Sequence, residues 1–302
     1  MKENNMDKAH IGFIGLGLMG AAMVECLQKA GHAVTVLGNR DRTGVEAALA
    51  RGATEAAHAR AVAEASDIVM LCMGTSAQVE SRIYGDDGVL AGTREGQVVI
   101  DFGTSLPAST RRIGGDLAGK GATYLDAPLG RTPAHARDGL LNIMCSGDKA
   151  TFDRVKPVLH TLGENVFHLG ALGNGHTIKL INNCYSMTTA CAMAEAFAIA
   201  DATGIERQAL YNVMAAGPNH SGMMDFINAY ANGGRIDLAF TVANAAKDVG
   251  YYRQMATEMG LFSRMSIAAD ATLREARDGG DGGLMVPQMI DWMVRHLGEE
   301  KK

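Results

Sequence analysis

The first 170 residues alternate between short apolar runs and segments with helical spacing. The runs with the length of strands are residues 10–14, 33–37, 68–73, 98–102, 123–125 and 140–145. Turns that contain Gly, Asp or Ser separate these runs, and helical spacing follows the first two of them, at residues 21–30 and 45–51. This order begins as a β-α-β unit, and it predicts a mostly parallel sheet covered by helices.

Beyond about residue 170 the strand-like alternation disappears and helical spacing dominates. The stretch Thr177–Thr203 is long enough for a helix of about 40 Å at 1.5 Å per residue, with Gly204 as its stop. A chain of 302 residues exceeds what one hydrophobic core usually organises. We therefore predict an α/β domain over residues 1–170 and an all-helical domain over residues 171–302, joined by a long interdomain helix.

Composition narrows the class of function. Hydrophobic residues make up 47% and charged residues 20%, with a formal net charge of −5, and these values are typical of an ordinary soluble globular protein. A single Trp and the lack of a Lys/Arg-rich tract argue against nucleic acid as a partner. No uncharged apolar stretch reaches the roughly 18 residues of a membrane helix, because Glu195 interrupts the best candidate. Five cysteines without a CxxC pair favour the reducing cytoplasm.

A glycine-rich turn follows the first predicted strand and opens the first predicted helix. It reads GLGLMG, a GxGxxG pattern formed by Gly15, Leu16, Gly17, Leu18, Met19 and Gly20. Small residues at these places let a pyrophosphate approach the backbone N–H groups at the start of a helix. The same residues could also make no more than a tight strand-to-helix turn, but the β-α-β frame favours a dinucleotide site.

The residues at the end of the second predicted strand usually determine whether NAD or NADP binds. An acidic residue at this place hydrogen-bonds the ribose 2′-OH of NAD, whereas an arginine accommodates the 2′-phosphate of NADP. The chain reads LGNRDR over residues 37–42. Either arginine could be a solvated loop charge, but Arg40 and Arg42 together favour NADP over NAD. We assign Asn39 and Arg40 to the cofactor site.

A second glycine-rich entry, GNGHTIKLINN at residues 173–183, opens the predicted long helix. Lys179 and Asn183 are four residues apart and share a helix face. A lysine amine beside an amide on an apolar helix suits general acid–base chemistry, because partial burial lowers the pKa of an ammonium group and the amide fixes its direction. The alternative is a surface lysine. We interpret His176 as a capping or supporting residue rather than a catalyst.

Five motifs occur together in one order: GLGLMG at 15–20, DFGTSLP at 101–107, DAPLGRT at 126–132, GNGHTIKLINN at 173–183 and AKD at 246–248. On these motifs the chain resembles the β-hydroxyacid dehydrogenase family over nearly its whole length. The resemblance implies a Rossmann-type NAD(P)-binding domain, a helical domain for substrate binding and dimerisation, and interconversion of a small β-hydroxyacid and its semialdehyde by hydride transfer. It makes Lys179 the general acid and base, and Asn183 its positioning partner.

The resemblance also assigns residues near the nicotinamide. Lys247 and Asp248 resemble the family's KD pair, and Thr104 resembles the Ser/Thr of its DxSTxxP motif. Gly103 stands where that motif has Ser, so this chain lacks that side chain. We add Met73, at the end of the 68–73 run, to the cofactor residues.

The substrate loop departs from most of the family. Many members have Ser-Gly-Gly after DAPV, whereas this chain has Gly130, Arg131 and Thr132. An arginine there suits a bidentate clamp on a carboxylate, sulfonate or phosphonate. The alternative is a structural pair with an acid such as Asp138.

One branch of the family shares this loop. The Gly-Arg-Thr loop, together with Ser186 after Asn182 and Asn183, is similar to the 3-sulfolactaldehyde reductase branch. We therefore assign the loop, Asn182 and Ser186 to the substrate, a small anionic aldehyde or hydroxyacid. The acidic residue that this branch has after its second strand, typical of NAD enzymes, is missing here.

The sequence thus predicts a cytoplasmic NAD(P)-dependent alcohol dehydrogenase or aldehyde reductase that forms a homodimer or homotetramer. No metal is expected, because the cysteines lack the spacing of a zinc site and no histidine pair has HxxxH spacing. Two alternatives are an imine reductase of the same fold, in which this lysine is usually replaced, and a non-catalytic nucleotide-binding protein. Lys179 argues against the first, and Lys179 with Asn183 argues against the second.

Overall fold

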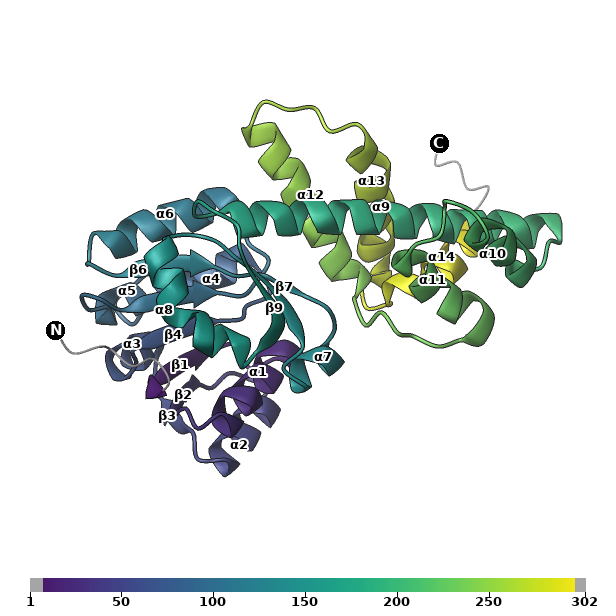
Figure 1. Cartoon of the computed structure of the whole chain (residues 1–302). Coiled ribbons are helices and arrows are strands. Elements are labelled where there is room, and N and C mark those ends of the chain that lie inside the picture. The colour runs from purple at the N-terminus through teal and green to yellow at the C-terminus, as the bar shows by residue number, and fades with distance from the viewer. Residues whose placement is uncertain (1–7, 297–302) are drawn as a thin grey trace. The chain divides into compact units, whose positions relative to one another are not determined.

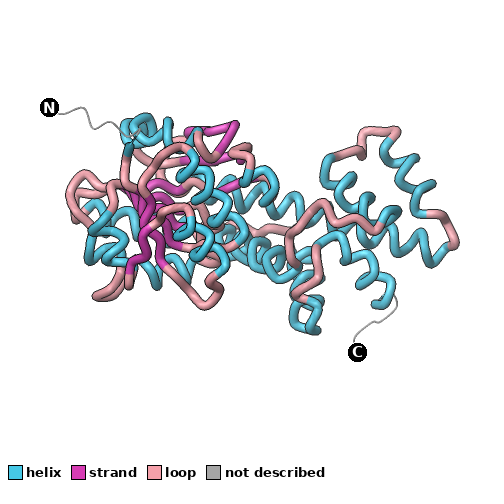
Figure 2. The backbone as a smooth tube through the Cα atoms, turned by 90° about the horizontal axis from the view of Figure 1, so that it is seen from below, coloured by secondary structure: helices cyan, strands magenta, loops and turns pink. Residues whose placement is uncertain are grey.

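The computed structural model describes residues 8–296 and contains two compact units, which divide between Lys179 and Leu180. Every strand among the described residues belongs to the N-terminal unit, and Figure 2 shows these strands gathered in one part of the chain. The C-terminal unit consists of helices and loops, with one isolated bridge between Thr241 and Met285. No described helix combines the length and hydropathy that crossing a bilayer requires. The predicted order of an α/β part followed by a helical part is confirmed.

Six parallel strands form the main sheet, in the order β3-β2-β1-β4-β5-β6. Their bounds are β1 (Ile11–Ile14), β2 (Val34–Leu37), β3 (Thr54–Ala56), β4 (Ile68–Leu71), β5 (Val98–Asp101) and β6 (Thr123–Asp126). The chain moves outward in one direction from β1 to β3 and in the other from β4 to β6. The carboxyl ends of β1 and β4 therefore flank the point where the strand order reverses, which is where Rossmann-type sheets bind ligands.

Helices cover both faces of this sheet (Figure 1). They are α1 (Leu18–Lys29), α2 (Thr43–Ala50), α3 (Ala59–Ala65), α4 (Ser76–Ile83), α5 (Val89–Gly92), α6 (Pro107–Ala118), α7 (Pro133–Arg137) and α8 (Lys149–His160). Because side chains alternate along a strand, each strand supplies two cores. Phe13 and Met70 pack in the core that includes α1 and α8, whereas Ile14 and Leu71 pack in the core that includes α3, α4 and α6.

The apolar run at 140–145 was predicted to join the main sheet, and this prediction is wrong. It forms β8 (Leu141–Cys145), the middle strand of a separate sheet with β7 (Leu129–Gly130) and β9 (Gly163–His168). The chain turns back through α7, so β7 and β8 pair antiparallel, while β8 and β9 pair parallel. Burial alternates along β8, which is typical of a strand with one covered face.

The C-terminal unit is built around one apolar core. Its helices are α9 (Asn174–Thr203), α10 (Arg207–Ala215), α11 (Gly222–Gly233), α12 (Val242–Glu258), α13 (Met265–Ala276), η2 (Arg277–Asp281), η3 (Val286–Gln288) and α14 (Met289–His296). Phe197 of α9, Val249 of α12 and Leu273 of α13 are fully buried in this core. Helix α9 begins at Asn174, in the N-terminal unit, and ends before Gly204, whose φ of 73° confirms the predicted stop.

Candidate active site

A groove of about 250 Å³ lies at the carboxyl ends of β1 and β4. Five of the predicted cofactor residues line it: Gly15, Leu16, Gly17, Asn39 and Met73. The remaining residues of the GLGLMG motif form the first turn of α1. The sequence therefore located this groove, which coincides with the reversal of strand order.

The turn between β1 and α1 fits a pyrophosphate. A Cβ on Gly20 would lie 1.9 Å from the carbonyl oxygen of Gly15, so only glycine lets α1 begin this close to the turn. A Cβ on Gly17 would meet nothing within 4 Å and would fill the open space above the turn. Gly17 caps α1 without a side-chain hydrogen bond, so the first N–H groups of the helix have room for an external acceptor.

Nine residues that line the groove were not predicted from the sequence, and three of these carry charged or amide side chains. Asp41 follows β2, and Gln78 and Arg82 lie on α4. The side chain of Gln78 accepts a hydrogen bond of 3.0 Å from the backbone N–H of Gly74, which fixes the loop after β4. The signal that could have identified Gln78 and Arg82 is the position of α4, which follows a buried strand of the sheet.

Cys72 also lines the groove, on the loop after β4. Desolvation raises the pKa of its thiol to about 12, and the nearby Asp101 carboxylate adds to the shift. The thiol is therefore protonated at neutral pH, and a nucleophilic role does not fit it.

The two arginines after β2 lie in different surroundings. Arg42 makes two hydrogen bonds to Glu55, of 2.6 and 2.9 Å. Arg40 is exposed, lines neither the groove nor the neighbouring cavity, and has no ion-pair partner among residues 8–296. Sequence reasoning did not find Glu55, because it lies 13 residues beyond Arg42 on a strand that had not been predicted.

A buried carboxylate ties the start of α9 to the main sheet. Asp126, the last residue of β6, accepts hydrogen bonds of 2.8 Å from the backbone N–H groups of Gly173 and His176 and a further bond from the Ser146 hydroxyl. Ser146 in turn accepts a bond of 2.9 Å from the N–H of Gly175. All of these groups belong to the N-terminal unit, and together they fix the turn from which Lys179 follows.

The ring of His176 completes this anchor. It is fully buried, and its Nδ1 lies 2.7 Å from the Thr110 hydroxyl of α6. Its Nε2 lies 3.7 Å from a carboxylate oxygen of Asp101, the last residue of β5. Asp101 itself accepts bonds from the Gly103 N–H and the Ser105 hydroxyl, each of 2.8 Å. Two strand-terminal carboxylates thus surround the first turn of α9.

Helix α9 carries the two predicted catalytic residues and two of the predicted substrate residues on one face. Lys179, Asn182, Asn183 and Ser186 follow the spacing i, i+3, i+4 and i+7. Lys179 and Ser186 are half-buried, Asn182 is exposed, and Asn183 is buried. Within one helix this spacing brings the four side chains into one row.

The KD pair lies beside Asn183, within the C-terminal unit. The amide nitrogen of Asn183 donates to Asp248 at 2.6 Å, and Lys247 Nζ lies 2.9 Å from the other oxygen of Asp248. The side-chain amide of Asn182 donates to the side-chain oxygen Oδ1 of Asn183 at 3.3 Å. Asp248 is 1% exposed, so its contacts are screened little by water. The sequence identified these residues separately but did not connect Asn183 with Asp248.

The predicted substrate loop lies in the N-terminal unit. Arg131, after β7, has a φ of 75°, and its Nη1 donates to the carbonyl oxygen of Leu140 at 2.7 Å and to Glu164 at 2.6 Å. The acid considered from the sequence, Asp138, is not its partner. Thr132 lies at the start of α7, with its hydroxyl 2.8 Å from His135 Nδ1. Thr104 lies half-buried after β5.

The described residues 8–296 hold no group of three or more His, Cys, Asp and Glu side chains arranged for a metal ion.

Two family models cover almost the whole chain. Residues 10–170 match the NAD binding domain of 6-phosphogluconate dehydrogenase. Residues 173–293 match the model described as NAD-binding of NADP-dependent 3-hydroxyisobutyrate dehydrogenase.

Individual relatives agree with these models. The chain is 32% identical to 2-hydroxy-3-oxopropionate reductase of Escherichia coli over 95% of this chain and 98% of that protein. It is 30% identical to 3-sulfolactaldehyde reductase of the same organism, over 91% and 92% of the two chains. A solved structure of 3-hydroxyisobutyrate dehydrogenase from Mycobacterium tuberculosis with L-serine is similar, with a TM-score of 0.85 at 27% identity over 95% and 99% of the chains.

Proposed function

The chain belongs to the β-hydroxyacid dehydrogenase family, and we propose that it reduces a small anionic semialdehyde to the corresponding hydroxyacid or sulfonate analogue. It is an NAD(P)-dependent oxidoreductase of CH–OH groups and their carbonyl forms. The observation that carries the proposal is the row on α9, where Lys179 is one turn before an asparagine that Asp248 holds. The experiment that tests it compares the rates at which anionic and neutral aldehydes are reduced with NADPH.

The proposed chemistry needs a proton at the carbonyl oxygen. The reduced nicotinamide supplies the hydride that goes to the carbonyl carbon. Lys179 donates a hydrogen bond to the carbonyl oxygen, stabilises the negative charge that develops there and transfers its proton as the C=O π bond breaks. Water then returns a proton to the amine. In the oxidative direction the neutral amine of Lys179 accepts the proton of the hydroxyl group.

Asn183 is the proposed positioning partner of Lys179. Its amide nitrogen is committed to Asp248, so the amide is fixed in one orientation. The side-chain oxygen of Asn183 is then left as an acceptor for the ammonium group of Lys179, which lies on the same helix face. Lys247 lies 2.9 Å from the buried Asp248 and supplies the opposite charge that a buried carboxylate needs.

Arg131 is proposed to bind the anionic end of the substrate, with Gly130, Thr132, Asn182 and Ser186 as further contacts. Both of its hydrogen bonds use Nη1, and no other acceptor among residues 8–296 bonds its guanidinium. The edge formed by Nε and Nη2 therefore offers two parallel donors to a carboxylate or sulfonate. Glu164 and Leu140 hold the arginine from the opposite edge.

Substitution of Arg131 tests this assignment. We expect Arg131→Lys and Arg131→Ala to raise KM for anionic aldehydes by about ten- to a hundredfold, since a point charge does not reproduce a fork with two donors. Neutral aldehydes of equal length should be affected less than about threefold, and dinucleotide affinity should not change. Arg137→Lys, at the exposed end of α7, is the matched control. Equal losses on charged and neutral aldehydes would make Arg131 structural.

We further propose that NADP is preferred over NAD. The support is Arg40, which is exposed and has no ion-pair partner in the described chain, and the absence of an acid directly at the end of β2. We expect kcat/KM with NADPH to exceed the value with NADH by about tenfold, because an arginine gains a charge-assisted contact only with the 2′-phosphate. Equal or better use of NADH in the same assay would contradict this preference.

We also propose that the enzyme is cytoplasmic and forms a homodimer or homotetramer. All five cysteines are unpaired, which fits a reducing compartment. The C-terminal unit exposes large apolar side chains such as Tyr185, Val213 and Phe262, which subunit contacts would cover.

A further inference from the structure

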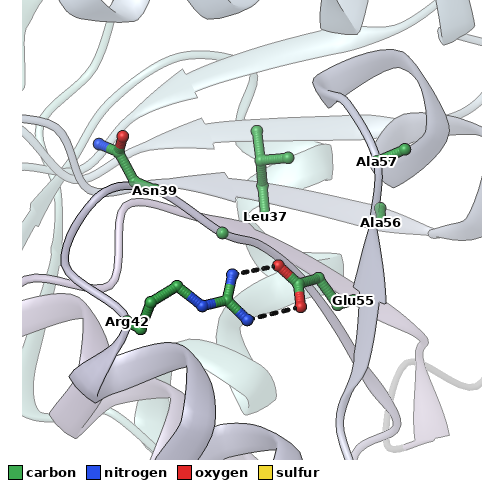
Figure 3. A pocket seen from close by; sticks show the side chains of 7 residues that line it. Leu37, Asn39, Arg42, Glu55, Ala56 and Ala57 are labelled. Carbon is green, nitrogen blue, oxygen red and sulfur yellow. Dashed lines mark hydrogen bonds and ion pairs between the residues drawn. The ribbon is translucent and has the colours of Figure 1, made fainter.

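Arg42 and Glu55 form a two-bonded ion pair beside the end of β2. Arg42 Nη1 lies 2.6 Å from Glu55 Oε1, and Nη2 lies 2.9 Å from Oε2. Figure 3 shows the guanidinium and the carboxylate facing each other across these two bonds. One carboxylate thus occupies the edge formed by the two terminal nitrogens, which is one of the two edges where an arginine can offer paired donors to a phosphate or carboxylate.

This pair borders the cofactor groove. It lines a cavity of about 530 Å³ together with Leu37, Gly38 and Asn39, and the same three residues line the groove at the GLGLMG turn. A Cβ on Gly38 would lie 2.2 Å from Glu55 Oε1 and 2.4 Å from Arg42 Nη1, so the pair packs directly against the backbone of Gly38. The segment after the second strand is where Rossmann-type domains distinguish a ribose 2′-OH from a 2′-phosphate.

The charges of the pair act differently on the two dinucleotides. A 2′-phosphate carries up to two negative charges and suits an arginine fork, but here Glu55 occupies the edge between the two terminal nitrogens, neutralises the guanidinium and repels a second anion. The hydrogen bond to Arg42 lowers the pKa of the Glu55 carboxyl group, so Glu55 is ionised at neutral pH. A ribose with a free 2′-OH meets no such repulsion, and a carboxylate can accept its hydrogen bond.

We propose that Glu55 limits the preference for NADP: by holding Arg42 it lowers the affinity for NADP(H) relative to NAD(H). The 2′-phosphate and the Glu55 carboxylate compete for one guanidinium. The chain's preference for NADP is therefore smaller than its two arginines would give without Glu55. This inference rests on the dinucleotide part of the proposed function and is independent of the aldehyde substrate.

The test is binding of NADPH and NADH to the full chain, measured by nicotinamide fluorescence without any aldehyde. Glu55→Gln keeps the size of the side chain and removes its charge. We expect the ratio of Kd for NADH to Kd for NADPH to rise by about five- to twentyfold, mainly through tighter NADPH binding. Asp153→Asn removes the same charge from an exposed pair with Lys149 that lines neither cavity, and should change the ratio by less than about twofold.

A second substitution separates release of Arg42 from loss of a charge. In an Arg42→Gln background, Glu55→Gln should give a clearly smaller gain in NADPH affinity, because it still removes the repulsion but no guanidinium remains to be released. An unchanged ratio in Glu55→Gln, or the same gain with and without Arg42, would overturn the inference. Thermal unfolding of each variant verifies folding. A protein that binds both dinucleotides but reduces no aldehyde would refute the proposed function and leave this test valid.

Discussion

Lys179→Ala is expected to lower kcat for aldehyde reduction by about two to four orders of magnitude, with little change in the Kd of the dinucleotide. In the proposed mechanism, removal of the ammonium group leaves the developing alkoxide without its proton donor, so the proton must come from water. Lys179 is not among the residues that line the groove at the GLGLMG turn, so we expect the affinity for the dinucleotide not to depend on it. Steady-state kinetics and a separate NADPH titration measure the two effects.

Two further variants make this result specific to the ammonium group. Lys179→Met keeps the aliphatic stem and should lose activity as Lys179→Ala does. Lys156→Met, an exposed lysine on α8, is the matched control and should retain full activity. A small primary amine added to the alanine variant should restore part of the rate. Near-normal kcat in both Lys179 variants would remove this residue from the mechanism.

Asp126→Asn is expected to affect both stability and turnover. The amide keeps one oxygen but places an NH₂ group where the other oxygen was, so this group faces either the donors of Gly173 and Ser146 or the N–H group of His176. Each buried donor left without an acceptor costs about 1–3 kcal/mol, so the free energy of unfolding should fall by about 2–4 kcal/mol. For a domain of this size that lowers Tm by roughly 5–15 °C.

The same substitution should reduce kcat well below the unfolding transition. Because Asp126 fixes the first turn of α9, its loss misplaces Lys179, and displacements of about 1 Å can cost on the order of a hundredfold in rate. Asp153→Asn, in an exposed ion pair, should leave both Tm and kcat nearly unchanged. A variant with lowered Tm and normal kcat at low temperature would make Asp126 purely structural. Calorimetry and kinetics at one low temperature distinguish the two roles.

The main elements of the fold could be predicted because they are local. The buried strands β1, β2, β4 and β5 are short apolar runs, and their boundaries were predicted within one or two residues. Strand β3 was missed because its sequence, Thr-Glu-Ala, is short, polar and mostly exposed. The place of β8 was wrong because an apolar run does not reveal which sheet it joins, and that choice depends on the reversal through α7.

The site could be predicted only where a motif is contiguous. The GLGLMG turn and the row on α9 each lie within one short segment, so spacing alone grouped their residues. The partners of Asn183, Arg42 and Arg131 are 65, 13 and 33 residues away in sequence, and folding alone brings them together. The two strand-terminal carboxylates, Asp101 and Asp126, carried a signal that was not used, an acid directly after a buried apolar run.

The most direct test of the proposed function compares substrates of the wild-type enzyme. NADPH oxidation is followed with three- and four-carbon aldehydes that end in a carboxylate or sulfonate, with neutral aldehydes of equal length, and with a cyclic imine. We predict that kcat/KM for the best anionic aldehyde exceeds that for its neutral counterpart by about two orders of magnitude and exceeds that for the imine. Faster reduction of the imine than of every anionic aldehyde, or no oxidation of NADPH with any aldehyde, would contradict the account.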